Sequence, residues 1–267
     1  MEMTFEKQSF VRRIKSMLVV DFRRMFTMPL SYIMTGISFV IPILVLVMTT
    51  MMDGSVSVNP ETGEETVIEV FDSVWQTIGS ISNDAAAVDM SLTGMCNINL
   101  VYFMLAVLVC MFVAADFRSG YVKNLFAVRS KKTDYVVSKI IVTFVTGVAM
   151  MLVFFTGAVL GGFIAGVPFE MGIATESSIV MCMLAKVFLV AAFVPVYLLM
   201  SVIAKDKLWL SILLSMFVGM MFFAVIPAIT PLDSTIMNVG LCIIGGILFS
   251  IGFGIISKTV LSKKDLL

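Results

Sequence analysis

The sequence contains no histidine, and only 13% of its 267 residues are charged. Without an imidazole, the chain lacks the commonest general base and the commonest metal ligand, so Ser-His and Cys-His catalytic pairs are excluded. No Gly-Lys dipeptide occurs either, and the Walker phosphate-binding loop requires one. We therefore expect no catalytic residue, no metal site and no unaided ATP hydrolysis.

Cysteine is scarce as well, with four residues in the chain. Cys96, Cys110, Cys182 and Cys242 all fall in apolar stretches, and no two of them form a CxxC pair. This spacing is typical of neither a metal site nor a disulfide framework. We expect these cysteines to be small buried side chains.

Hydrophobic residues, in contrast, make up 60% of the chain, whereas soluble domains contain roughly 45–50%. A water-soluble enzyme is excluded. Six apolar runs are long enough to cross a hydrocarbon core, which takes roughly 20 helical residues. They cover residues 30–52, 95–115, 140–167, 178–204, 208–230 and 236–257. Because lipid cannot hydrogen-bond an exposed backbone, we predict an all-α integral membrane protein with six transmembrane helices.

The basic residues are confined to one set of connecting segments. Residues 1–29, 116–139, 205–207 and 258–264 contain 17 of the 18 Lys and Arg residues. The alternate segments 53–94, 168–177 and 231–235 contain eleven acidic residues and no basic one. Since basic segments remain in the cytoplasm, we expect both termini to be cytoplasmic and segment 53–94 to be an outside loop.

Residues 1–29 are predicted to form a separate cytoplasmic elbow before the transmembrane domain, residues 30–267. Apolar residues recur there at helical spacing among the arginines and lysines: Phe10, Ile14, Met17, Leu18, Phe22, Met25 and Phe26. This pattern predicts a basic amphipathic helix lying on the inner leaflet. The alternative is a helix that packs only against the protein's own cytoplasmic loop.

The outside loop 53–94 has two possible structures. Apolar residues from Val67 to Ile78 are compatible with an amphipathic helical face, while the β-branched residues at 55–69 favour a short hairpin.

Small residues of the third span recur at four-residue spacing, at Gly157 and Gly161 and at Gly162 and Gly166. Such glycines allow close helix contacts within the bundle; the alternatives are a subunit interface and a substrate-facing groove.

Ionisable residues are nearly absent from the six spans. None contains Asp or Glu, and coupling to protons or sodium usually requires such groups at membrane depth. Energy for any transport would therefore come from another subunit. Lys186 is the lone charge within a span. It either snorkels toward the outer head groups, or faces the bundle interior, pairs with Glu170, Glu176 or Asp233, and lines a substrate path.

The cytoplasmic segment 116–139 has the pattern of a short amphipathic helix. Tyr121, Leu125, Phe126 and Val128 could form its apolar face among several basic residues. A helix of this kind, protruding from the inner face of the membrane, suits docking of a cytoplasmic partner. The alternative is that its basic residues only set the membrane topology.

This segment carries the clearest resemblance to a known family. Asp116, Phe117, Gly120, Lys123 and Asn124 form an acidic-aromatic-x-x-Gly-x-x-Lys-Asn stretch, followed by Arg129 and Lys139. The stretch, together with the elbow and the six spans, resembles the type-2 permeases of ABC transporters. The sequence departs from those permeases that have a long re-entrant segment between the last two spans, because few residues are available near 226–236.

The resemblance implies an ABC exporter subunit in a bacterial plasma membrane. It implies a coupling helix that contacts a separate cytoplasmic ATPase through Arg118, Gly120, Tyr121, Lys123, Asn124, Phe126 and Arg129. ATP and Mg would bind to that ATPase, and no cofactor to this chain. Expected partners are the ATP-binding subunit, a second or sister permease and membrane lipid, with no nucleic acid. The exported substrate would be amphipathic, such as a peptide, drug or lipid, and small permeases of this family often serve peptide antibiotics.

A second hypothesis assigns the chain to another class of protein. It would be a membrane scaffold or sensor that moves no substrate and signals to a cytoplasmic protein. Association with an ATP-binding subunit separates the two hypotheses.

Overall fold

The structure of the protein is a computed structural model, which describes residues 10–52, 56–58, 65–67, 71–79, 97–128, 131–170, 172, 174–223 and 225–263. Its elements in chain order are α1 (Phe10–Thr27), α2 (Pro29–Met51), β1 (Val56–Val58), β2 (Glu65–Val67), the 3-10 helix η1 (Val74–Thr77), α4 (Leu100–Arg118), α5 (Tyr121–Val128), α6 (Lys132–Ala165), α7 (Glu176–Ala204), α8 (Leu208–Phe223), α9 (Ile226–Ile229) and α10 (Ile236–Lys263).

Within the described ranges, five helices are long and apolar enough to cross a membrane: α2, α4, α6, α7 and α10. The fifth predicted span, 208–230, is not one continuous helix, because α8 ends at Phe223 and α9 is a separate short helix. Pro227 lies at the start of α9, where its missing N–H and its ring prevent the preceding helix from continuing. With 16 residues, α8 is about 24 Å long, shorter than a hydrocarbon core.

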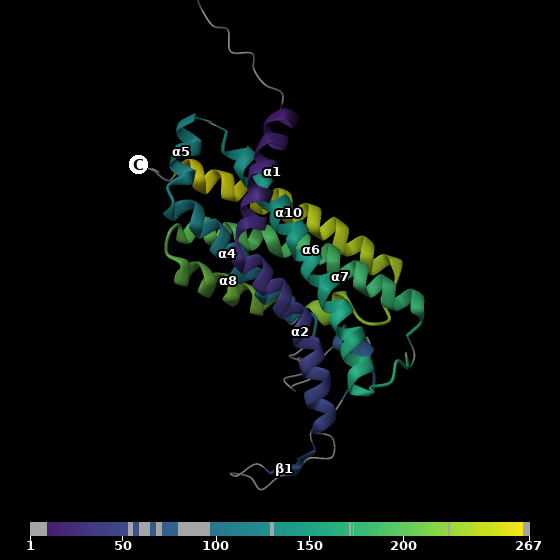
Figure 1. Cartoon of the computed structure of the whole chain (residues 1–267). Helices are drawn as coiled ribbons and strands as arrows, with labels where there is room; N and C mark the ends of the chain where they lie inside the picture. Colours follow the sequence, from purple (N-terminus) through teal and green to yellow (C-terminus); the bar gives the residue numbers. More distant parts are fainter. Residues whose placement is uncertain are drawn as a thin grey trace, which may run out of the picture.

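One end of the bundle, called the basic end here, gathers the segments that are rich in Lys and Arg. It comprises α1, residues 116–128 and 131–139, the linker 205–207 and the last turns of α10. Lys132 Nζ donates a hydrogen bond to the carbonyl oxygen of Leu261 at 2.8 Å, and Arg118 Nε donates to that of Asp206 at 3.1 Å. Figure 1 shows α5 beside the end of α10. The segments that charge places on one side of the membrane therefore meet at one end of the fold.

The opposite end, called the acidic end here, joins η1 to residues 166–175 and 230–235. Ser73 Oγ donates to the carbonyl oxygen of Glu170 at 2.6 Å, and Trp75 Nε1 donates to that of Phe169 at 3.1 Å. The strands β1 and β2 pair antiparallel, with Val56 opposite Val67, and lie beyond the far end of α2 (Figure 1). The pairing of these strands confirms the hairpin alternative for 55–69, and among the described residues 71–79 the only helix is η1.

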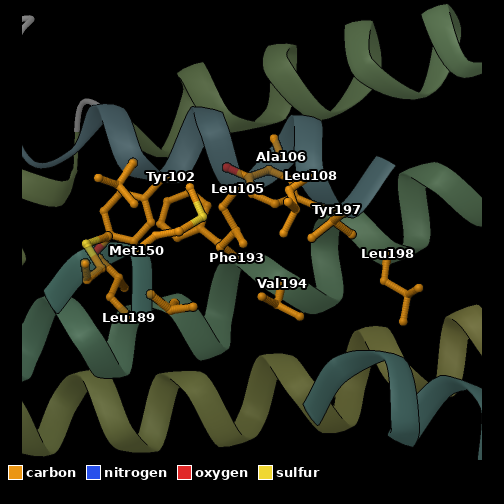
Figure 2. Packing of buried hydrophobic residues seen from close by; sticks show 14 of the residues in the cluster. Tyr102, Leu105, Ala106, Leu108, Met150, Leu189, Phe193, Val194, Tyr197 and Leu198 are labelled. Atoms are coloured by element: carbon orange, nitrogen blue, oxygen red, sulfur yellow. The ribbon is translucent and has the colours of Figure 1, made fainter. Parts of the chain in front are cut away.

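The centre of the bundle is formed mainly by α4 and α7. Tyr102 and Phe193 stack with ring centroids 4.5 Å apart, and Leu105, Met150 and Val194 are fully buried. Figure 2 shows these side chains filling the space between neighbouring helices. Since the core is a packed apolar cluster from several helices, burial here fixes the positions of both α4 and α7.

Two glycines allow α6 to approach α2 closely. A Cβ atom at Gly161 would lie 2.8 Å from the Cα of Ile43, and one at Gly157 would overlap the carbonyl oxygen of Phe39. The two helices therefore touch backbone to backbone, as small residues at four-residue spacing permit. Packing within the bundle is confirmed for this pair of glycines.

The predicted N-terminal helix is present as α1. Met17, Asp21 and Met25 are buried at four-residue intervals, so one face packs on the bundle, while Val19 and Phe26 remain exposed. The alternative of packing against the protein itself thus holds for one face, and the other is left for lipid or solvent.

Candidate coupling site

The candidate coupling site begins where α4 ends. After Arg118 the chain passes through Ser119 to Gly120, whose φ is +70°. Side chains with a Cβ rarely adopt this backbone conformation, so glycine allows the sharp reversal into α5. The short helix predicted in 116–139 is present as the eight residues of α5.

The helix α5 has an inner and an outer face. Val122 is 1% exposed, and Tyr121, Leu125 and Phe126 pack against the main hydrophobic core. The Phe126 ring meets Tyr135 of α6 edge-on, with centroids 5.8 Å apart. Tyr121, Leu125 and Phe126 of the predicted apolar face therefore pack on the protein's own bundle, while the side chain of Val128 lies outside the described part of the chain.

The outer face of α5 is formed by exposed residues. Lys123, Asn124 and Ala127 are all exposed, at the positions that helical geometry turns away from Val122 and Phe126. This outer face is small, polar and basic, and it is the part of α5 that another protein can contact.

Beneath α5 lies a buried cluster of charged side chains, called the ionic cluster here. Lys139 Nζ lies 2.9 Å from Asp21 Oδ1 and 2.7 Å from Asp116 Oδ2, and all three side chains are fully buried. Arg24 Nη2 lies 2.6 Å from Asp116 Oδ1. Two cations thus face two carboxylates, and the opposite charges offset the cost of burial.

Each of the two carboxylates also accepts a hydrogen bond from a neutral group. Ser138 Oγ donates to Asp21 Oδ2 at 2.6 Å, and Tyr135 Oη donates to Asp116 Oδ2 at 3.0 Å. Buried carboxylates require such donors, because an unsatisfied oxygen is costly in a low dielectric. The ionic cluster therefore joins α1, α4 and α6 through ion pairs and hydrogen bonds, although Arg24 Nη1 and Asp116 Oδ1 have no hydrogen-bond partner among the described residues.

Tyr121 connects α5 to this cluster. The guanidinium of Arg24 lies over its ring, 4.1 Å from the centroid, in the geometry of a cation–π contact. Burial and the carboxylates of Asp21 and Asp116 raise the pKa of Tyr121, although Arg24 lowers it. The phenol stays protonated at neutral pH and packs as a neutral ring. Through Arg24, Tyr121 thus contacts the cluster that joins α1, α4 and α6.

The structure brings most of the predicted coupling residues together. Arg118 and Lys123 are exposed, Gly120 makes the turn, and Tyr121 and Phe126 anchor α5 from inside. Asn124 is on the outer face. Arg129 lies outside the described residues.

Sequence reasoning did not find the α1 part of the ionic cluster, Asp21 and Arg24. A signal was present, because Asp21 lies four residues from both Met17 and Met25, on the apolar face of a basic helix. An acid in that position needs a buried cationic partner.

Lys186 is buried near the acidic end. Its side chain does not snorkel, because the residue is only 1% exposed. Its ammonium donates to Asn99 Oδ1 at 2.9 Å and to Thr230 Oγ1 at 3.0 Å. The location inside the bundle is confirmed, but these hydrogen-bond acceptors are neutral side chains rather than the carboxylates that were predicted.

In the described part of the chain, no group of three or more Cys, Asp or Glu side chains could hold a metal ion.

A family model described as ABC-2 family transporter protein matches residues 27–222, from the end of α1 to the last turn of α8. The chain belongs to the ABC-2 transporter family. ABC-2 permeases are membrane transport components that typically work with a cytoplasmic ATP-binding subunit. As a member of this family, the chain is a multi-pass membrane protein and a component of a transporter. No curated protein and no solved structure matches the chain. The ABC-2 match includes α4, α5 and α6 of the candidate coupling site, but it leaves out all of α1 except Thr27, and so leaves out Asp21 and Arg24 of the ionic cluster.

Proposed function

We propose that this chain is the membrane-spanning subunit of a bacterial ABC exporter, which moves an amphipathic substrate across the plasma membrane. A separate ATPase subunit, with its own ATP and Mg, would supply the energy. The observation that carries the proposal is the outer face of α5, which is exposed and basic while the inner face is fixed to the bundle.

The proposed orientation places the basic end in the cytoplasm. Lys and Arg in short connecting segments favour that side, and α1 would then lie beside the inner leaflet with Val19 and Phe26 toward lipid. The acidic end and the β1–β2 hairpin would be outside.

In the proposed mechanism, the ATPase contacts the outer face of α5, with Lys123 attracted to acidic residues of a cleft. Nucleotide binding would move α5, and the Arg24–Tyr121 contact together with the ionic cluster would carry this movement to α1, α4 and α6. The result would be a rigid-body rearrangement between two permease bundles. The second bundle would be another copy or a sister permease.

The test is copurification followed by an ATPase assay. We expect the tagged chain to bind an ATP-binding protein and raise its ATPase rate. Lys123→Glu should weaken that association about tenfold, which is roughly 1.4 kcal/mol, because it reverses a charge on the outer face without disturbing packing. The matched control is Lys258→Glu, the same change at an exposed lysine of α10.

Two results would contradict the proposal. One is the absence of any ATP-binding protein in the purified complex, which would favour the scaffold or sensor hypothesis. The other is equal loss of ATPase stimulation in the Lys123 and Lys258 variants, because the effect would then not belong to α5.

A further inference from the structure

The chain buries two lysines completely, and their surroundings differ in charge. Lys139 lies between the carboxylates of Asp21 and Asp116. Lys186 instead donates to the amide oxygen of Asn99 and the hydroxyl oxygen of Thr230, and among the described residues no salt bridge includes it. The fold thus neutralises one buried ammonium and leaves the other with neutral acceptors.

The cost of this arrangement makes Lys186 a candidate for ligand binding. Neutral oxygens satisfy two of the three N–H donors of an ammonium, but they do not cancel its charge. A charged side chain inside a membrane bundle is expensive and normally pairs with an opposite charge. An anion that entered beside Lys186 would supply the missing charge.

The position of the two acceptors makes such entry possible without unfolding a long helix. Asn99 immediately precedes α4, and Thr230 immediately follows the one-turn helix α9. Both acceptors are therefore at the ends of elements, whereas Lys186 lies inside the long helix α7. Movement of either end away from α7 would free an N–H donor of Lys186.

We propose that Lys186 binds the carboxylate of the exported amphiphile, so that the substrates are singly charged acids rather than neutral or cationic molecules. The inference rests on the proposed exporter function and names the substrate class. A single charge fits because Lys186 is one cation that has no carboxylate partner among the described residues. Without substrate, Asn99 and Thr230 would take the place of the substrate oxygens.

The test compares two probes that differ only in charge, dodecanoylglycine and its uncharged amide, dodecanoylglycinamide. Their direct binding to the purified chain is measured in phosphatidylcholine nanodiscs, without the ATPase, at neutral pH, where the acid is ionised. We expect the acid to bind about tenfold more tightly than the amide, the size of effect that a charge-assisted hydrogen bond supplies.

Variants distinguish a binding role from a purely structural one. Lys186→Met should abolish the preference for the acid, and Lys186→Arg should retain most of it. Asn99→Asp is the sharper variant, because it supplies an internal carboxylate at the position of Asn99 Oδ1. This variant should remain folded, with a thermal midpoint equal to or above that of the original protein, and should lose the preference for the acid. The matched control Lys258→Met should keep it.

The inference is overturned if the original protein binds acid and amide equally, or if the preference survives both Lys186→Met and Asn99→Asp. It is also overturned if phosphatidylglycerol in the nanodisc displaces the acid, since the site would then hold a lipid head group. If instead the proposed exporter function is wrong, the experiments give a different result. In that case the acid preference persists in the isolated chain, but no ATP-binding subunit associates with it.

Discussion

At the scale of single residues, the ionic cluster places opposite charges in balance. Lys139 and Arg24 face Asp21 and Asp116, so removal of one carboxylate leaves an excess buried cation. We expect Asp116→Leu to lower stability by about 3 kcal/mol or more, the usual effect of breaking a buried pair. The measurement is the midpoint of thermal unfolding of the purified chain.

A charge-balanced double variant is the control. Asp116→Leu combined with Lys139→Met leaves Arg24 and Asp21, one charge of each sign. The double variant should be more stable than Asp116→Leu alone. If both variants unfold at the same temperature, charge balance does not explain the stability of the cluster. Lost packing of the Asp116 side chain would then have to account for the lower stability.

The sequence predicts the surroundings of a single residue only where residues close to it in the chain determine them. Lys186 is recognisable as unusual because it interrupts an apolar span. Its acceptors are not, since Asn99 and Thr230 lie 87 and 44 residues away in the chain. The same limit applies to Asp21, whose partner Lys139 is 118 residues distant. Hydropathy and spacing show that a buried charge needs a partner without showing which one.

At the scale of elements, the contact between α2 and α6 depends on glycine. Gly161→Val should destabilise the bundle by about 1–3 kcal/mol through overpacking, because its Cβ would meet the backbone of Ile43. Gly252→Val is the matched control, since a Cβ at Gly252 has nothing within 4 Å. Thermal unfolding in nanodiscs compares the two, and equal destabilisation would contradict the assigned contact.

Hydropathy predicts which segments cross the membrane better than it predicts where the helices begin and end. It locates the cores of α2, α4, α6, α7 and α10, because lipid selects apolar residues there. It misses the start of α6 at Lys132, since a helix can continue into water with polar residues. It also misses the break between α8 and α9, where Pro227 ends the helix while hydropathy stays high. The outer face of α5 could be identified only after the inner contacts of Val122 and Phe126 were known.

At the scale of the whole molecule, the two ends of the bundle carry different proposed tasks. At the basic end, α5 rests on the ionic cluster and offers Lys123, Asn124 and Ala127 to another protein. At the acidic end, Lys186 is buried without a carboxylate partner among the described residues. The long helices α4, α6 and α7 run between the ends, so a push on α5 is expected to alter the surroundings of Lys186.

The central claim is that α5 is the docking element for a separate ATPase. Its most direct test is photo-crosslinking in membranes, with a benzoylphenylalanine residue placed at Ala127 on α5 or, as a control, at Met237 on the opposite end. Both positions are exposed. We predict a crosslink from position 127 to a protein that binds ATP and contains a Walker loop, with none from position 237. No such crosslink from 127, or an equal one from 237, would contradict the claim.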